Sequence, residues 1–272
     1  MLHWTMLKLR TLASGSKGNC TYIATDTTHI LVDVGLSLQQ IEARMKAAEI
    51  NPNTITAILL THEHTDHICG LPLFLQKYKN CTLYLHEDAI DLVSKMLHKQ
   101  RFHDLDRIQS YNTPTLIGDI DINFFEVPHD SKFCFGFTFE NAGAKISLAT
   151  DLGHVDAKII KAMANSDIVL LESNHDLGKL SANVKYPVVL KRRVAGSLGH
   201  LSNTAASLAA YELAKANVEQ IILVHLSEQN NSPTLAYTFM KDFLARKGLV
   251  EGVDISIDVA GQHEIGKLYV IS

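Results

Sequence analysis

Residues 61–67, with the sequence THEHTDH, constrain the fold more than any other part of this chain. They place three histidines and one aspartate, all potential metal ligands, in the pattern HxHxDH. In an extended backbone His62 and His64 point to the same side, since side chains alternate with period two, and Asp66 and His67 can face a second position. The segment therefore predicts a loop that serves two metal ions rather than a solvated polar loop.

Apolar patterns on either side place this loop between a strand and a helix. Residues 55–60 form a compact apolar run suited to a buried strand, and apolar residues recur at helical spacing over 68–78. Active sites of layered α/β proteins commonly lie where strands end. We therefore expect the ligands at a strand-to-helix junction.

Length and composition are those of an ordinary globular protein. The 272 residues are 46% hydrophobic and 20% charged, and no Pro-, Gly- or Ser-rich linker divides them, so we expect one domain over residues 1–272. The formal net charge of −4 gives no global reason to expect nucleic-acid binding, although a local basic patch can provide it. Residues 1–10 lack signal-peptide features and no apolar run reaches roughly 18 residues, which predicts a cytoplasmic protein without membrane association.

The cysteines form no metal-ligand pattern. Cys20, Cys69, Cys81 and Cys134 contain no CxxC pair, and each lies in or beside an apolar segment. We expect buried free thiols in a reducing compartment. The absence of thiolate ligands also argues against a structural zinc site of the cysteine type.

The amino-terminal region predicts an antiparallel meander followed by a helix. Residues 6–13, 20–25 and 29–34 are short, rich in β-forming residues and separated by turn residues, and 37–49 has one apolar face at helical spacing. Asp33 lies at the end of the third strand. We expect it to orient a ligand histidine or the loop backbone, as carboxylates beside metal ligands do, rather than to bind metal.

The first turn of the meander, residues 14–19, has the sequence SGSKGN. Its glycines can expose backbone N–H groups toward an anion, which makes Ser14, Ser16 and Asn19 candidate substrate contacts. A plain hairpin turn is the alternative interpretation of the same residues.

Strand and helix patterns alternate after the metal-ligand loop. Strands are expected at 82–85, 121–127, 133–139, 145–149, 168–171, 220–224, 255–259 and 268–271, and helices at 88–98, 157–164, 204–216 and 234–247. Three of these strands are each followed by one metal-binding residue type, namely His129, Asp151 and His225. They are candidate strand-end ligands.

The order of these residues resembles the metallo-β-lactamase superfamily over essentially the whole chain. It begins with HxHxDH and continues with a lone histidine, a lone aspartate and a late histidine. The resemblance implies an α/β fold, a four-layer αββα sandwich of two mixed sheets flanked by helices, with two divalent metal ions at one edge of the sheets. Imidazoles and carboxylates suit Zn, Mn or Fe. The ligand set that it implies is His62, His64 and His129 for one ion, Asp66, His67 and His225 for the other, and Asp151 as a bridge.

Finer features resemble the YycJ/WalJ branch of that superfamily. They are LASGSKGN at 12–19, SNHD at 173–176, YP at 186–187 with LKRR at 190–193, GHLSN at 199–203 and VHLS at 224–227. This branch implies a bacterial metal-dependent hydrolase with exonuclease activity on DNA 5′ ends, so DNA is the expected partner.

The ligand set motivates a hypothesis for the reaction. Two metal ions would lower the pKa of a bridging water and direct hydroxide at a phosphodiester phosphorus. Related phosphodiesterases use a histidine in a similar late motif near the substrate phosphate, which makes His200 the candidate to stabilise or protonate the leaving oxygen. Asp66 could additionally orient the nucleophile.

Several further residues are candidate substrate contacts. Lys191, Arg192 and Arg193 form the only run of three basic residues, and with the resemblance a nucleic-acid contact is favoured over a solvated charged turn. Ser202 belongs to the GHLS motif. His175 is equally compatible with substrate contact and with structural hydrogen bonding.

Three alternatives stay open. A cyclic phosphodiesterase acting on small molecules would share the phosphorus chemistry and the late histidine. A thioesterase resembling hydroxyacylglutathione hydrolase would use the same metals on a carbonyl, but needs a distinct C-terminal substrate domain that the late βα pattern does not suggest. A non-catalytic scaffold with a decayed site is disfavoured because all seven ligand types are present.

Overall fold

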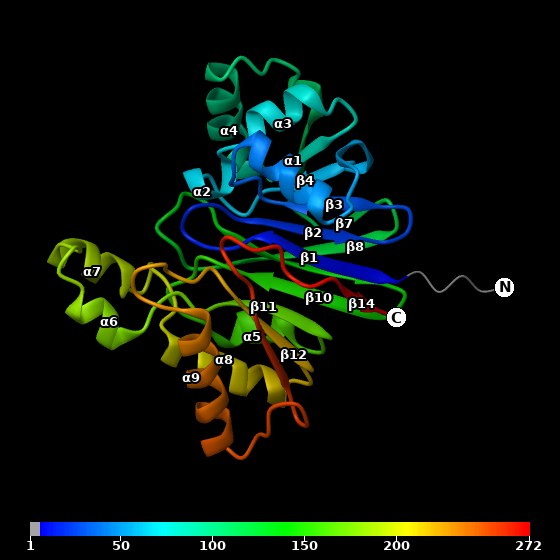
Figure 1. Cartoon of the computed structure of the whole chain (residues 1–272). Helices are drawn as coiled ribbons and strands as arrows, with labels where there is room; N and C mark the ends of the chain where they lie inside the picture. The colour runs from blue at the N-terminus through cyan, green and yellow to red at the C-terminus, as the bar shows by residue number, and fades with distance from the viewer. Residues whose placement is uncertain (1–5) are drawn as a thin grey trace.

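The computed structural model describes residues 6–272. The first half of the amino-terminal segment 1–10 therefore lies outside the described residues. Two mixed sheets pack face to face, and helices cover the outer face of each (Figure 1). This arrangement is the four-layer αββα sandwich that the sequence predicted.

The first sheet consists of β1 (Leu7–Ala13), β2 (Cys20–Ala24), β3 (His29–Val32), β4 (Ala57–Leu59), β5 (Thr82–His86), β6 (Ile108–Tyr111) and β14 (Tyr269–Ile271). Its spatial order is β14-β1-β2-β3-β4-β5-β6. The predicted meander is confirmed, because β1, β2 and β3 pair antiparallel, whereas β3 to β6 run parallel. Helices α1 (Leu38–Ala47), α3 (Leu71–Lys77) and α4 (Glu87–Lys99) lie over this sheet (Figure 1).

The second sheet consists of β7 (Thr115–Ile117), β8 (Ile120–Glu126), β9 (Phe135–Asn141), β10 (Ala144–Ala149), β11 (Ile168–Glu172), β12 (Gln220–Val224) and β13 (Ser256–Val259). Its spatial order is β13-β12-β11-β10-β9-β8-β7, with β10 to β13 parallel. Helices α5 (Ala157–Met163), α8 (Asn203–Lys215) and α9 (Pro233–Arg246) lie over its outer face, while α6 (Leu177–Ala182) and α7 (Val188–Val194) project from the body (Figure 1).

Strands of both sheets contribute to one apolar core between them. Leu9 and Ile58 of the first sheet and Phe137 and Leu170 of the second belong to the same buried cluster, and each is 0% exposed. Complete burial of such a side chain contributes about 1.5–3 kcal/mol. The central strands are covered on both faces, which explains why their sequences are apolar runs rather than alternating patterns.

The expected helix over 68–78 is two helices. The first is α2 (Thr65–Ile68) and the second is α3, with Cys69 and Gly70 between them. The Gly70 N–H donates to the Val34 carbonyl at 2.9 Å, and a Cβ at Gly70 would lie 2.1 Å from the Leu36 carbonyl oxygen. Packing against the loop after β3 therefore breaks the helix directly behind the metal-ligand residues.

Two further predictions concern the burial of the cysteines and the absence of a membrane-spanning segment. Cys20, Cys81 and Cys134 are buried free thiols as expected, but Cys69 is exposed, because it lies at the break between α2 and α3 instead of inside a continuous helix. Among residues 6–272, no helix is long and apolar enough to cross a bilayer.

Candidate metal centre

Asp33 fixes the start of the metal-ligand loop. Its backbone has a left-handed φ of 62°, which aspartate tolerates better than most residues. One carboxylate oxygen accepts from the Thr61 N–H at 2.9 Å, and the other accepts from the Thr61 hydroxyl at 2.9 Å and from His67 Nδ1 at 2.7 Å. The predicted role of Asp33 in orienting a histidine and the loop backbone is confirmed by these contacts.

Gly35 allows the loop to lie against the end of β3. A Cβ at Gly35 would lie 1.7 Å from the Asp66 carbonyl oxygen, a distance at which no side chain fits. That oxygen accepts from the Asn19 N–H, and the His67 carbonyl oxygen accepts from the Val34 N–H, both at 2.8 Å. The first turn and the end of β3 thus fix the backbone that carries Asp66 and His67.

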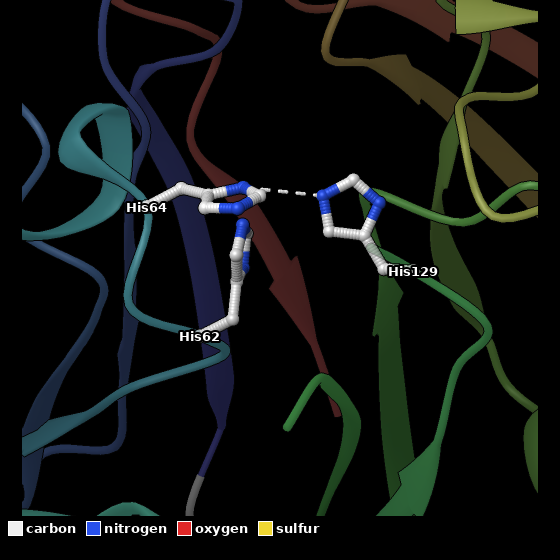
Figure 2. A group of neighbouring side chains, drawn as sticks. All are labelled: His62, His64 and His129. Atoms are coloured by element: carbon white, nitrogen blue, oxygen red, sulfur yellow. Dashed lines mark hydrogen bonds between the residues drawn. The ribbon is translucent and has the colours of Figure 1, made fainter. Parts of the chain in front are cut away.

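Three histidines converge from two loops (Figure 2). His62 and His64 follow β4 and His129 follows β8, and one nitrogen of each lies within 4.8 Å of the others. His129 Nδ1 faces the Gly199 carbonyl oxygen at 3.2 Å and must donate to it, so Nε2 presents its lone pair 3.2 Å from His64 Nδ1. The buried Nε2 of His62 has no hydrogen-bond partner among the described residues. Three imidazoles aimed at one point are suited to a metal ion.

The second group contains Asp66, His67, Asp151 and His225, with ligand atoms within 4.8 Å of one another. His67 Nε2 lies 3.1 Å from Asp151 Oδ2, and His225 Nε2 lies 3.4 Å from Asp66 Oδ2. Asp151 also approaches the first group, since its Oδ1 is 3.9 Å from His129 Nε2. Asp151 and His225 both have a φ of 56°, and backbone strain of this kind is typical of functional sites.

The two groups differ in charge. Burial lowers the pKa of His62 and His129, so these two rings of the first group are neutral imidazoles. In the second group burial alone would lower the pKa of His67, but Asp33 and Asp151 outweigh it and raise the value to about 10. The carboxylates there require a buried cation. In the absence of metal a proton on histidine supplies that charge, and a divalent ion would replace the proton. The donor set therefore fits divalent metal.

Glu172, at the end of β11, is the site residue that the sequence interpretation missed. It is fully buried, and its Oε1 accepts from His225 Nδ1 at 2.7 Å and from His200 Nδ1 at 2.8 Å. Its Oε2 accepts from the Leu152 N–H at 3.0 Å and from the Leu201 N–H at 3.1 Å. Burial by itself would raise its pKa, but the neighbouring His200 and His225 lower it to about 2. A lone carboxylate that ends a fully apolar strand was the available signal.

His200 lies beside both groups. Its Nδ1 is 3.6 Å from Asp151 Oδ1, and its side chain is 20% exposed, whereas the side chains of His67 and His225 are 0% and 2% exposed. Because Glu172 engages Nδ1, Nε2 is the nitrogen left for other partners. Burial alone would lower the pKa of His200, but Glu172 outweighs it and raises the pKa.

The candidate substrate contacts of the first turn have structural partners. Ser14 Oγ accepts from the His225 N–H at 2.8 Å, and Asn19 lies 3.0 Å from His67 Nε2 through its Nδ2, while Ser16 is exposed. The turn joins the antiparallel β1 and β2, as a hairpin does, and its contact with substrate stays a prediction. Ser202 caps α8 by accepting from the Ala205 N–H.

His175 is nearly fully buried, at 1% exposed, and neither of its ring nitrogens has a hydrogen-bond partner among residues 6–272. Burial lowers its pKa to about 4, so the ring is neutral. The structural hydrogen bond that was one of its two expected roles is not made by the described side chains.

The basic run lies on helix α7 rather than in a turn, and its contact with nucleic acid stays a prediction. Its three members have different surroundings. Lys191 Nζ donates to the Ser181 carbonyl at 2.5 Å, and Arg193 forms an ion pair with Asp130, the residue after His129. Arg192 is exposed.

Relatives of known name extend over nearly the whole chain. Residues 28–226 match the family described as Beta-lactamase superfamily domain. Exodeoxyribonuclease YycJ of Bacillus anthracis is 36% identical over 250 residues, which cover 90% of this chain and 92% of that protein. Exodeoxyribonuclease WalJ of Streptococcus pneumoniae is 36% identical over 92% of this chain and 93% of that protein.

Solved structures share the fold at low identity. The metallo-beta-lactamase fold protein YhfI of Bacillus subtilis has a TM-score of 0.72 at 16% identity and covers 98% of this chain and 99% of its own. Human tRNase Z, short form, has a TM-score of 0.66 at 14% identity and covers 96% and 98%. Because the family match spans most of the chain and the 36% identity extends over nine-tenths of it, the chain belongs to the metallo-β-lactamase superfamily and, within it, to the YycJ/WalJ family of hydrolases.

Proposed function

We propose that this chain is a phosphodiester hydrolase that uses two divalent metal ions and degrades DNA from 5′ ends. The observation that carries the proposal is the convergence of two ligand groups beside the pair His200 and Glu172. The exodeoxyribonuclease names of the relatives with 36% identity support DNA as the substrate. Zn, Mn and Fe each suit the imidazole and carboxylate donors.

The ligand residues divide into two sets in this proposal. His62, His64 and His129 would hold one ion and Asp66, His67 and His225 the other. Asp151 would be shared by both sets, which its position between the groups supports. Bound divalent ions supply Lewis-acid stabilisation of the phosphate and activate water for attack. Asp66 is 25% exposed at its side chain, so it is the carboxylate of this set that can orient an incoming water.

His200 acts on the leaving oxygen. Its Nδ1–H donates to Glu172, which fixes the ring plane and leaves Nε2 directed away from that carboxylate. Glu172 also binds His225, so one carboxylate holds the candidate acid and a metal ligand at a fixed separation. Such positioned proton transfer contributes typically about 10²–10⁴-fold to rate.

The direct test uses end-labelled duplex DNA with and without a 5′ phosphate, incubated with the protein and Mn²⁺. We expect progressive shortening from the 5′ end. Intact DNA combined with rapid turnover of cyclic nucleotides would favour the small-molecule phosphodiesterase. Metal-loaded protein that hydrolyses neither DNA nor bis(p-nitrophenyl) phosphate would refute an enzymatic role and favour a scaffold.

Two substitutions separate the proposed roles. His200→Ala should retain both metal ions by elemental analysis and lose most activity, because His200 is not in either ligand set. Asp151→Ala should lose metal, because Asp151 lies between the sets. A His200→Ala protein without metal would show that the division of roles is wrong.

The thioesterase alternative gains no support from the fold. It requires a distinct C-terminal substrate domain. Among the described residues, β12 and β13 instead belong to the second sheet, and α8 and α9 cover its outer face. Hydrolysis of a glutathione thioester by the metal-loaded protein is the measurement that would revive it.

A further inference from the structure

Residues 177–202, here called the arm, have an unusual charge. The arm contains α6, α7 and the turn that leads to α8, and it has five Lys and Arg residues and no Asp or Glu. Since the whole chain has a formal net charge of −4, the residues outside the arm carry −9. A basic segment on an otherwise acidic protein is the electrostatic footprint of a polyanion-binding surface.

The arm also exposes apolar side chains near these charges. Val184 is 96% exposed, Val188 62% and Val189 78%, and α7 contains no buried residue. Residues three and four apart share a helix face, so Val188 lies beside Lys191 and Arg192. Helix α7 therefore presents uncovered apolar side chains beside its positive charges.

Three of the five basic side chains are available to a ligand. Arg193 is paired with Asp130 and Lys191 is bonded to Ser181, whereas no described carboxylate forms an ion pair with Lys179, Lys185 or Arg192. All three are exposed. Arg193 thus has a separate role, which is to attach the arm to the loop that carries His129.

Both ends of the arm lie at the metal centre. Its first residue follows His175 by two positions, and its last, Ser202, pairs with His175 in a β-bridge. His200 lies near its end, and the Gly199 carbonyl accepts from His129 Nδ1 at 3.2 Å. Between these ends α6 and α7 project from the body on the side where α2 lies (Figure 1). A chain bound along the arm would therefore lead directly into the centre.

We propose that the arm holds the DNA next to the cleaved end, with Lys179, Lys185 and Arg192 on phosphates and the exposed valines against the bases. This inference rests on the proposed function, because it takes DNA as the substrate. A polymer of phosphates matches several separated cations, and apolar side chains beside them are used by DNA-binding proteins to contact base steps. Contact with the centre favours the substrate over a membrane as the occupant.

The test is DNA binding by the full-length protein, measured as fluorescence anisotropy with a duplex whose terminal linkages are phosphorothioates that resist hydrolysis. The variant Lys179→Gln/Lys185→Gln/Arg192→Gln should bind about 10–100-fold more weakly at low salt. The slope of log affinity against log salt should decrease in magnitude by about 2–3, roughly 0.9 for each phosphate that is no longer neutralised. The variant Lys179→Arg/Lys185→Arg, which keeps both positive charges, should bind as the wild type does.

The matched control removes the same charge elsewhere. Lys79, Lys99 and Lys161 are exposed and lie outside the arm. The variant Lys79→Gln/Lys99→Gln/Lys161→Gln should bind DNA with the wild-type slope. If it weakens binding as much as the arm variant does, net charge rather than the arm governs binding and the proposal is wrong.

The valines have a different signature. Val188→Ser/Val189→Ser should weaken binding without changing the salt slope, because no charge is removed. Since α7 buries no residue, circular dichroism and metal content should be those of the wild type, which separates a weaker DNA interaction from a failure to fold.

Three further outcomes would contradict the DNA-binding role of the arm or separate it from the proposed function. An arm variant that keeps wild-type affinity and slope overturns the proposal. So does an arm variant that loses binding only to phosphatidylcholine–phosphatidylglycerol vesicles, since the arm would then be a membrane surface. If the wild type binds DNA through the arm but hydrolyses none, the proposed function fails and only the DNA-binding part of the inference stands.

Discussion

Asp33 and Glu172 are buried carboxylates at equivalent places, one at the end of β3 in the first sheet and one at the end of β11 in the second. Each accepts from the Nδ1 of a histidine in the metal centre, at 2.7 Å for Asp33 with His67 and 2.7 Å for Glu172 with His225. Each also accepts a backbone N–H from the loop that it holds. Both sheets thus use the same means to fix an imidazole.

The two carboxylates differ in how many segments they join. Among residues 6–272, the Asp33 carboxylate bonds within the loop of residues 61–67, to Thr61 and His67. Glu172 uses both oxygens twice and joins three separate loops through Leu152, His200 and His225. The first carboxylate orients one ligand, whereas the second couples a ligand to the candidate acid. Their replacement should therefore have different consequences.

Glu172→Gln should have the largest effect. An amide has one acceptor oxygen, so its NH₂ group must face either two imidazole donors or two backbone N–H groups, and two buried donors lose their partner. We expect kcat/KM on DNA to fall about 10²–10⁴-fold. The exposed Glu219→Gln is the control and should have wild-type kinetics. An active Glu172→Gln enzyme would reduce Glu172 to the limited role of Asp33.

Gly35→Ala should destabilise the Asp33 side of the centre. The new Cβ would lie 1.7 Å from the Asp66 carbonyl oxygen, and this neighbour is backbone that cannot rotate away. We expect a loss of about 3 kcal/mol in the free energy of unfolding, measured by denaturant titration. Gly178→Ala, where the nearest atom is an Asp176 side-chain oxygen at 3.2 Å, is the control and should be near neutral. Equal stabilities would show that the loop moves freely.

Asp33→Asn should have a smaller effect than Glu172→Gln. Asparagine also tolerates the left-handed φ of 62°, so the backbone is retained, and the single acceptor oxygen can still serve His67. We expect metal affinity to fall about 10–100-fold, as on loss of a carboxylate behind a ligand histidine. Competition with a chelator measures it. At saturating metal, activity should return. If it does not, Asp33 does more than orient a metal ligand, and its role does not differ from that of Glu172.

The smallest effect concerns acid stability of the chelator-treated protein. The pKa of Glu172 is lowered to about 2 in the fold, below its usual value near 4.5. Its contribution to stability is therefore complete above about pH 4.5 and is lost as the pH falls toward 2. Unfolding free energies across this range should decline more steeply for the wild type than for Glu172→Gln. Parallel curves would mean that the pKa of Glu172 is the same in the folded and unfolded protein.

The contrast also explains which parts could be predicted. Asp33 lies where a strand pattern ends, near the dense HxHxDH loop, and its role was predicted from that proximity in sequence. Glu172 follows four apolar residues and belongs to none of the recognised ligand motifs, and its partners are 20 to 53 residues away. Helix α7 was missed for a related reason. It has seven residues and none of them is buried, so its apolar pattern is too short to indicate a helix.

The chemistry of the site could be predicted from sequence, because ligand types, strand-end positions and apolar periodicity are local properties of the chain. The sequence indicated His62, His64, Asp66 and His67 as one unit, and the fold through resemblance. The nitrogen that His67, His200 and His129 present could not be predicted in this way, since it depends on Asp33, Glu172 and the Gly199 carbonyl, which come from distant segments. That Arg193 pairs with Asp130 while Arg192 stays exposed likewise follows only from the tertiary structure, because pairing requires spatial proximity that sequence spacing cannot specify.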